Sequence, residues 1–188
     1  MASRKQELLD PLIAYLVRHG PADLSLRPMA AEIGTSARLL IFHFGSKERL
    51  LAEVLDEMQR RLQHSFRQMR SAPPGTRRVP LLRAFWDWAL QDEHFPSLSL
   101  LYQLNVLAAR DPDLRSNLLA RHAQDWLALI QPALSDPDAS PAQATLVGAV
   151  FDGLFLELMT TGDRVRTTQA LDAFLTMATP SAPSGGRR

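Results

Sequence analysis

The residues of this sequence best suited to chemistry are hydroxyl and basic side chains gathered in one stretch, residues 25–51. The stretch holds three serines at helix-start positions, together with Arg38, His43 and Lys47, and no acidic residue lies between positions 33 and 47. Guanidinium, ammonium and hydroxyl groups bind phosphate oxygens, and an arginine also pairs with the edge of a guanine. The pattern therefore favours nucleic-acid recognition over bond-breaking chemistry.

Two short helices joined by a glycine-containing corner are expected to position these groups. The first shows a capping serine and apolar residues at helical spacing: Ser25, then Leu26, Met29, Ala30 and Ile33. Gly34 suits the corner. Ser36 can cap the second helix, over 37–43, and Leu40 and Phe44 then point back towards the first. This is a helix-turn-helix, whose second helix enters the DNA major groove.

Each polar or exposed residue of this head has an expected role in DNA contact. Arg38 is the best candidate for a guanine or a phosphate. The other predicted contacts are thymine methyl groups for Ala37 and Leu39, a sugar or methyl group for Phe42, phosphates for Ser25, Ser36, His43 and Lys47, and flanking DNA for a basic arm of Arg4 and Lys5. The alternatives are that the serines act only as helix caps and that Phe42 belongs partly to the core.

Helical periodicity continues through the rest of the chain, and no strand pattern appears. A first helix within 3–18 contains Pro11, which either bends one helix or starts a second one. The long helix 46–69 leads out of the head. Further helices are predicted over 79–90, 98–109, 113–134, 142–162 and 164–178, with an ion pair between Arg121 and Asp125. We predict an all-α fold of about nine helices.

Three regions follow: a three-helix DNA-binding head at 1–46, a helical ligand-binding and dimerisation body at 47–178, and a disordered tail at 179–188 that is rich in Pro, Ser and Gly. Polar residues on otherwise apolar body helices suggest a pocket for a small, largely apolar ligand. Its predicted lining is Trp86, Tyr102, Asn105, Trp126 and Phe155. The alternative is that the aromatic residues simply form the core.

The last two helices carry more apolar surface than one partner covers, which predicts a homodimer. The expected interface residues are Val147, Phe151, Leu154, Leu158, Leu171 and Phe174, and the alternative is that they form the monomer's own core. The most apolar run, 144–159, is interrupted by Asp152 and Glu157 and is too short to span a bilayer, so no membrane partner is expected.

Composition narrows the choice of function. The chain has 188 residues, 46% hydrophobic and 22% charged, as in an ordinary soluble protein, and no signal-peptide pattern, so we expect a cytoplasmic protein. Residues 1–70 carry 11 Lys+Arg against 8 Asp+Glu, or +3, whereas 71–188 carry 10 against 12, or −2. The five histidines show no metal-ligand spacing, there is no cysteine, and no nucleophile or phosphate-loop motif occurs. No enzyme, cofactor or metal is expected.

The head resembles the TetR family of bacterial transcriptional regulators. The matching residues are Gly20, Ser25, Ala30, Gly34, Ser36, Leu40, His43, Phe44, Lys47 and Leu50. The resemblance implies a homodimer that binds a palindromic operator, a ligand pocket in each body, and release from DNA when the ligand binds. The sequence departs from the family at Ile41, where a phosphate-contacting Tyr is usual, and at Phe42, where a polar residue is common. The rival reading is a helical protein-interaction module with a degenerate helix-turn-helix.

Overall fold

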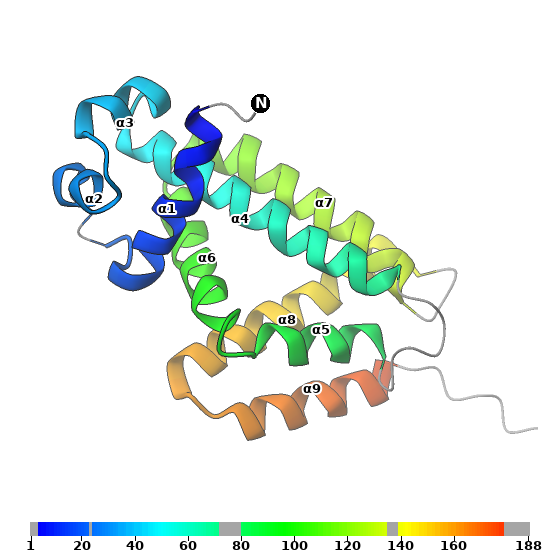
Figure 1. Ribbon diagram of the computed structural model, residues 1–188. Helices are drawn as coiled ribbons and strands as arrows, with labels where there is room; N and C mark the ends of the chain where they lie inside the picture. The colour runs from blue at the N-terminus through cyan, green and yellow to red at the C-terminus, as the bar shows by residue number, and fades with distance from the viewer. Residues whose placement is uncertain (1–3, 23, 72–79, 135–138, 179–188) are drawn as a thin grey trace, which may run out of the picture. The chain divides into compact units, whose positions relative to one another are not determined.

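The computed structural model describes residues 4–22, 24–71, 80–134 and 139–178, and every regular element in them is a helix (Figure 1). The predicted all-α fold is confirmed. The helices are α1 Arg4–His19, α2 Leu26–Glu32, α3 Ala37–Phe44, α4 Lys47–Arg70, α5 Leu81–Ala89, α6 Phe95–Ala108, α7 Ala120–Ile130, α8 Pro141–Thr161 and α9 Arg164–Ala178. The predicted tail, 179–188, lies outside the described residues.

The helices form two compact units. One joins Met1–Gln68 to Trp86–Ala123, and the other joins Met69–Phe85 to Gln124–Arg188. The first unit includes α6 because α6 packs against α1. The predicted boundary near position 46 separates a DNA-binding role from a ligand-binding role, and it stays a prediction about function.

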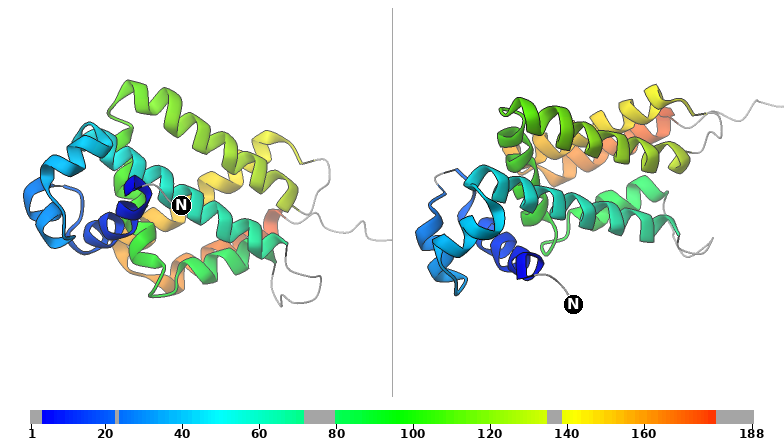
Figure 2. Two further views of the ribbon diagram at one scale, coloured as in Figure 1. Left: turned by 45° about the horizontal axis from the view of Figure 1, so that its top comes forward. Right: turned by 90° about the horizontal axis from the view of Figure 1, so that it is seen from above.

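In the first unit, α1, α2 and α3 gather at the N-terminal end of α4 (Figures 1 and 2). α1 is one continuous helix that contains Pro11, so the alternative of a separate N-terminal arm is wrong. The helices bury one continuous apolar core, and each fully buried aliphatic side chain contributes about 1.5–3 kcal/mol. Its least exposed members are Leu12, Leu16, Met29, Leu40, Val54 and Leu55.

Two helix boundaries differ from the sequence prediction. α6 begins at Phe95, three residues before the predicted start at 98, because Pro96 occupies the first turn, where a missing N–H costs nothing. The segment 113–134 is not one α-helix. It opens with a π-helical turn, Leu114–Leu119, and closes with a 3₁₀ turn, Gln131–Ala133, where Pro132 interrupts the α-helical hydrogen bonds.

In the second unit, α8 and α9 pack side by side (Figure 1). Ser140 and Gln143 form a reciprocal capping box at the start of α8, and Gly162 ends it with a positive φ of 69°. By length and composition alone, α8 could cross a membrane. In the subunit, 28% of its most apolar window is buried. At 21 residues it is longer than the predicted apolar run, and part of its surface is exposed within the subunit.

Candidate nucleic-acid interface

The turn between α2 and α3 is closed by its own backbone. The Thr35 N–H donates to the Ala30 carbonyl over 2.8 Å, and Gly34 has a φ of +72°, a conformation that favours glycine. Ser36 then caps α3: its Oγ accepts from the Leu39 N–H over 3.1 Å. The sequence signals for the corner and for this cap are both confirmed.

The two faces of α3 differ sharply. Leu40 and Phe44 are buried, 0% and 4% exposed, and join α3 to the core. On the other side Phe42 is 78% exposed, so the alternative that it belongs partly to the core is wrong. The Phe42 ring meets the His43 ring edge-on, with centroids 5.2 Å apart. α3 therefore presents an aromatic group on its outer surface.

The remaining α3 candidates also lie at or near that surface. Arg38 is exposed and has no hydrogen bond or ion pair to any residue that the structure describes. Ala37, Leu39 and His43 are half-buried. At eight residues, or about 12 Å, α3 has the length of the major-groove width. An unpaired guanidinium on such a helix is free to bind a base edge or a phosphate.

The three serines have different local roles. Ser46 caps α4, because its Oγ accepts from the Arg49 N–H over 3.2 Å. Ser25 occupies the N-cap position of α2 with an extended backbone, but its side chain makes no capping hydrogen bond, so the predicted cap is wrong at this position. The exposed Ser25 hydroxyl therefore remains available to a phosphate, whereas those of Ser36 and Ser46 already serve the backbone.

The predicted basic arm is instead the first turn of α1. Arg4 pairs with Glu7 over 3.0 Å. Lys5 pairs with Glu53 of α4 over 2.5 Å, and its Nζ lies 5.5 Å from the centre of the Phe44 ring. These contacts compete with DNA for both cations. Lys5 in particular fastens α1 to α4 and to the end of α3.

Two cations on the head were missed by the sequence reasoning. Arg27 in the first turn of α2 and Arg49 in the first turn of α4 are exposed, with no side-chain partner among the described residues. The sequence could have indicated both, because each lies within three residues after a serine at a helix start, Ser25 or Ser46. Phosphates bind at such N-terminal turns, and both arginines thus extend the candidate surface beyond Arg38 and Lys47.

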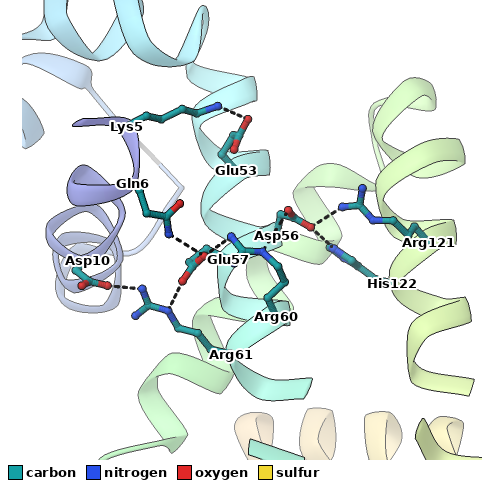
Figure 3. Close-up of polar contacts among 10 residues, drawn as sticks. All are labelled: Lys5, Gln6, Asp10, Glu53, Asp56, Glu57, Arg60, Arg61, Arg121 and His122. Carbon is teal, nitrogen blue, oxygen red and sulfur yellow. Dashed lines mark hydrogen bonds and ion pairs between the residues drawn. The ribbon is translucent and has the colours of Figure 1, made fainter. Parts of the chain in front are cut away.

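A polar network joins α4 to α1 on one side and to α7 on the other (Figure 3). From α1, Gln6 donates to Glu57 over 3.3 Å and Asp10 pairs with Arg61. Within α4, Glu57 accepts from Arg61 Nε over 2.6 Å and also pairs with Arg60. The side chain of Glu57 is only 7% exposed, so three donors surround one buried carboxylate.

On its other side α4 presents Asp56 to α7. Asp56 contacts Arg121 over 2.5 Å and the buried ring of His122 over 2.9 Å. The predicted partner of Arg121 was Asp125, one turn along the same helix. Arg121 takes Asp56 instead, which sequence spacing within one helix could not reveal.

The pKa values of these carboxyl groups follow from their partners. Burial alone would raise the pKa of Asp56, but the His122 hydrogen bond and the Arg121 charge outweigh it and lower that pKa. Burial opposes ionisation of Glu57 as well, and hydrogen bonds from Arg61 and Gln6 lower its pKa. The pKa of Glu48 is lowered by its own backbone N–H and by Ser46 at the start of α4. All three carboxylates are ionised at neutral pH.

The predicted ligand-pocket residues are divided between the two units. Trp86 is completely buried, Tyr102 and Asn105 are half-buried, and all three belong to the first unit. Trp126 and Phe155 belong to the second unit. A pocket of about 240 Å³ in the first unit is lined by other side chains, from α1, α4, α5 and α6. No group of three or more potential metal ligands occurs in the part of the chain that the structure describes.

The predicted interface residues fall into two groups, according to how far each is buried within the subunit. Val147, Phe151, Leu158 and Leu171 are at most 7% exposed within the subunit, so the alternative that they form its own core describes them better. Leu154 and Phe174 are half-buried. The large apolar side chains left exposed on α8 and α9 are Leu146, Leu156, Val165 and Met177.

A three-helix head with a capped, outward-facing third helix defines a helix-turn-helix DNA-binding protein. Residues 8–54 match the family model described as bacterial regulatory proteins, tetR family, and residues 91–181 match the tetracyclin repressor-like C-terminal domain. The chain belongs to the TetR family of transcriptional regulators, and it is not an enzyme.

Individual relatives agree with this assignment. The chain is 26% identical over 157 residues to the HTH-type transcriptional regulator BetI of Agrobacterium fabrum strain C58, covering 81% of this chain and 75% of the relative. It is 26% identical to the multidrug binding protein EbrR in a crystal structure with imidazole, at a TM-score of 0.68, covering 96% and 92% of the two chains. EbrR was also crystallised with ethidium, at 25% identity and a TM-score of 0.68, covering 95% and 100%.

Proposed function

We propose that the protein is a ligand-responsive repressor that binds a palindromic operator as a homodimer and leaves it when a small, largely apolar ligand binds. The observation that carries the DNA-binding part is the outer face of α3, where Arg38 is exposed and has no hydrogen bond or ion pair to a described residue. Ala37, Leu39, Phe42 and His43 share that helix, and Ser25, Ser36 and Lys47 flank it.

In this proposal α3 enters the major groove and the surrounding residues contact the backbone. Arg27 and Arg49 join Ser25, Ser36, His43 and Lys47 as phosphate contacts. Arg4 and Lys5 take part only where DNA displaces their carboxylate partners. Ile41 is 40% exposed and Phe42 is 78% exposed, so apolar contacts to sugars and methyl groups replace some of the usual polar ones.

Selection of binding sites from random double-stranded DNA tests this part directly. We expect a palindromic consensus whose half-sites lie about 34–36 Å apart or a multiple of that distance, because two related heads must reach grooves on one side of the duplex. Absence of any enriched sequence would contradict the proposal. It would favour a helical protein-interaction module, to which the exposed Ile41 and Phe42 are equally suited.

The homodimer is supported by the outer faces of α8 and α9. Leu146, Ala149, Gly153 and Leu156 lie on the exposed side of α8. A Cβ added at Gly153 would meet nothing within 4 Å in the subunit, so the subunit itself does not require glycine there. Small residues on an apolar helix face let a second helix approach closely, and a four-helix bundle across a two-fold axis would use this property.

Gly153→Leu tests the interface without disturbing the fold. We expect light scattering to show a dimer for the unchanged chain and a shift towards monomer for Gly153→Leu. Gly148→Leu is not a suitable control, since a Cβ there would lie 3.6 Å from Ile130 of the same subunit. Gln124→Leu is a better one, because Gln124 is exposed on α7 and lies on neither α8 nor α9. An unchanged chain that is monomeric at micromolar concentration would refute the dimer.

Ligand response is supported by two observations of different kinds. EbrR, a multidrug binding protein that is similar to this chain over nearly its whole length, forms complexes with imidazole and with ethidium. In this chain Gln63 and His122 are buried, and Gln63 Nε2 and His122 Nδ1 have no partner among the described residues. Buried polar atoms normally have partners, so such atoms suit a site that binds a ligand or water.

A further inference from the structure

The pocket of about 240 Å³ in the first unit touches the helix that begins the DNA-binding head. Ile13 of α1 forms one part of its wall, Met58, Arg61 and Leu62 of α4 another, and Leu98 and Leu101 of α6 a third. Ser65, Trp88 and His94 also face it. Most of this surface is apolar, and the Trp88 and His94 rings in its wall stack on each other, with centroids 4.0 Å apart.

The charged and polar groups in the lining favour an anion. Arg61 is the one permanently charged residue in it, and no carboxylate is among the lining residues. Arg61 uses Nε for Glu57 and Nη2 for Asp10. Its Nη1 has no partner among the described residues, and a guanidinium carries two N–H donors on that atom. These two N–H groups can donate to a ligand carboxylate while Nε keeps its contact to the buried Glu57.

The start of α6 adds a second group of donors. His94 holds the N-cap position and Ser97 lies in the first turn of this 14-residue helix, and both line the pocket. In the first turn of α6 the Phe95 N–H already donates to the Gln91 carbonyl and Pro96 has no N–H, so the Ser97 N–H is the backbone donor left among the described residues, at the positive end of the helix dipole. The Ser65 and Ser97 hydroxyls supply further hydrogen bonds.

We propose that this pocket is the effector site and that it takes a small amphipathic carboxylate, with its apolar part against Trp88 and Leu98 and its carboxylate on Arg61. This inference rests on the proposed function for its regulatory consequence, but not for the binding itself. It specifies a chemical class, an anion, that distinguishes this pocket from one built for cations or neutral molecules.

The position of Arg61 explains how binding would reach the DNA-binding head. Asp10 of α1 is 72% exposed where it pairs with Arg61, whereas Glu57 is 7% exposed. Water readily replaces the guanidinium at an exposed carboxylate, so a ligand carboxylate that binds across Nη1 and Nη2 of Arg61 takes the place of Asp10 and leaves Nε on Glu57. α1 then loses one of its polar links to α4 while Ile13 is pushed by the bound molecule. Both effects act on the helix that supports α2 and α3.

Isothermal titration calorimetry of the full chain with three molecules of one shape tests the ligand class. They are 3-phenylpropionate, the neutral 3-phenylpropanamide and the cationic 3-phenylpropylamine. We expect the carboxylate to bind about tenfold or more tightly than the amide, because a hydrogen bond to a charged partner is worth more than a neutral one, and the amine not to bind. Equal affinities, or no heat from the carboxylate at millimolar concentration, would overturn the inference.

Variants locate the site. Arg61→Gln should weaken carboxylate binding about tenfold or more and leave amide binding unchanged. Arg60→Gln is the matched control, because Arg60 also pairs with Glu57 but does not line the pocket. Ser97→Phe fills the pocket without touching an ion pair and should abolish binding of both molecules. Thermal melting confirms that each variant is folded.

Gln63→Leu tests whether the ligand binds at a different place on α4. Gln63 lies two residues from Ser65, and thus on the other side of α4. If Gln63→Leu abolishes carboxylate binding and Ser97→Phe does not, the ligand site lies elsewhere and the inference is wrong.

The regulatory step has its own measurement. With an operator from the selection experiment, 3-phenylpropionate should weaken DNA binding on the order of 5- to 150-fold, and Arg61→Gln should remove that effect. Carboxylate binding that leaves DNA affinity unchanged would overturn the effector role. If no operator is selected, the proposed repressor function fails, and calorimetry still decides whether the pocket binds carboxylates.

Discussion

Arg38 on α3 and Arg61 on α4 lie in the same unit, carry the same guanidinium group and are both exposed, but they differ in their ion pairs. Arg38 is exposed and unpaired among the described residues. Arg61 contacts Asp10 of α1 and Glu57 of its own helix. An arginine without such contacts can bind a partner without breaking an ion pair, whereas Arg61 links α1 to α4. Under the proposed function, the head uses different cations for DNA contact and for holding its helices together.

Removing Arg38 gives the largest effect expected from this contrast. Arg38→Ala should weaken binding to the selected operator by about 1–3 kcal/mol if it contacts a base. The free energy of unfolding should change by less than about 0.5 kcal/mol, because Arg38 is exposed and no hydrogen bond or ion pair to a described residue is lost. DNA titration and urea unfolding of the same sample measure both. Unchanged DNA affinity and sequence preference would remove Arg38 from the interface.

Replacing Glu57 should instead lower the free energy of unfolding. Glu57→Gln should lower the free energy of unfolding by about 1–2 kcal/mol, between the values for exposed and buried ion pairs, because its arginine partners can still reach water. Glu48→Gln is the matched control at an exposed site at the start of α4. Equal stability of the two variants in urea would show that the network of Figure 3 does not hold α1 to α4.

Lowering the pH should weaken the same network by protonating its carboxylates. The pKa values of Asp56 and Glu57 lie below their usual 3.8 and 4.5, so the unfolded chain binds protons first as the pH falls. Their contribution to stability is complete above about pH 4.5 and is lost as the pH drops through the lower folded values. Urea midpoints measured from neutral pH downwards should show a shallower acid loss for Glu57→Gln. If the urea midpoints of the unchanged chain and of Glu57→Gln fall equally with pH, Glu57 does not contribute to the acid sensitivity of the fold.

The serine caps give the smallest effects. Ser36→Ala should destabilise the fold by about 1 kcal/mol, since it removes the hydrogen bond to the Leu39 N–H. Ser25→Ala should change stability by no more than a few tenths of a kcal/mol, because Ser25 makes no side-chain cap. If Ser25 contacts a phosphate, its replacement should reduce DNA affinity instead. Thermal melting and DNA titration separate the two roles.

Local sequence was sufficient for the helices and for the helix-turn-helix. The spacing of Leu26, Met29 and Ala30, the corner at Gly34 and the cap at Ser36 depend on neighbours within a few residues, so periodicity and capping rules predict them. The same rules identified Ser140 as the start of α8. The family followed from these local signals because the head carries them in a fixed order.

What a side chain contacts across helices was decided only by the tertiary structure. Arg121 pairs with Asp56 across 65 positions and not with Asp125, and Lys5 pairs with Glu53 across 48 and does not form a free arm. The apolar rows of α8 likewise predicted a buried face, but not that Val147 and Phe151 face the subunit's own core. Periodicity determines which residues share a face. Which helix covers that face depends on packing between segments far apart in the chain, and the sequence alone does not specify it.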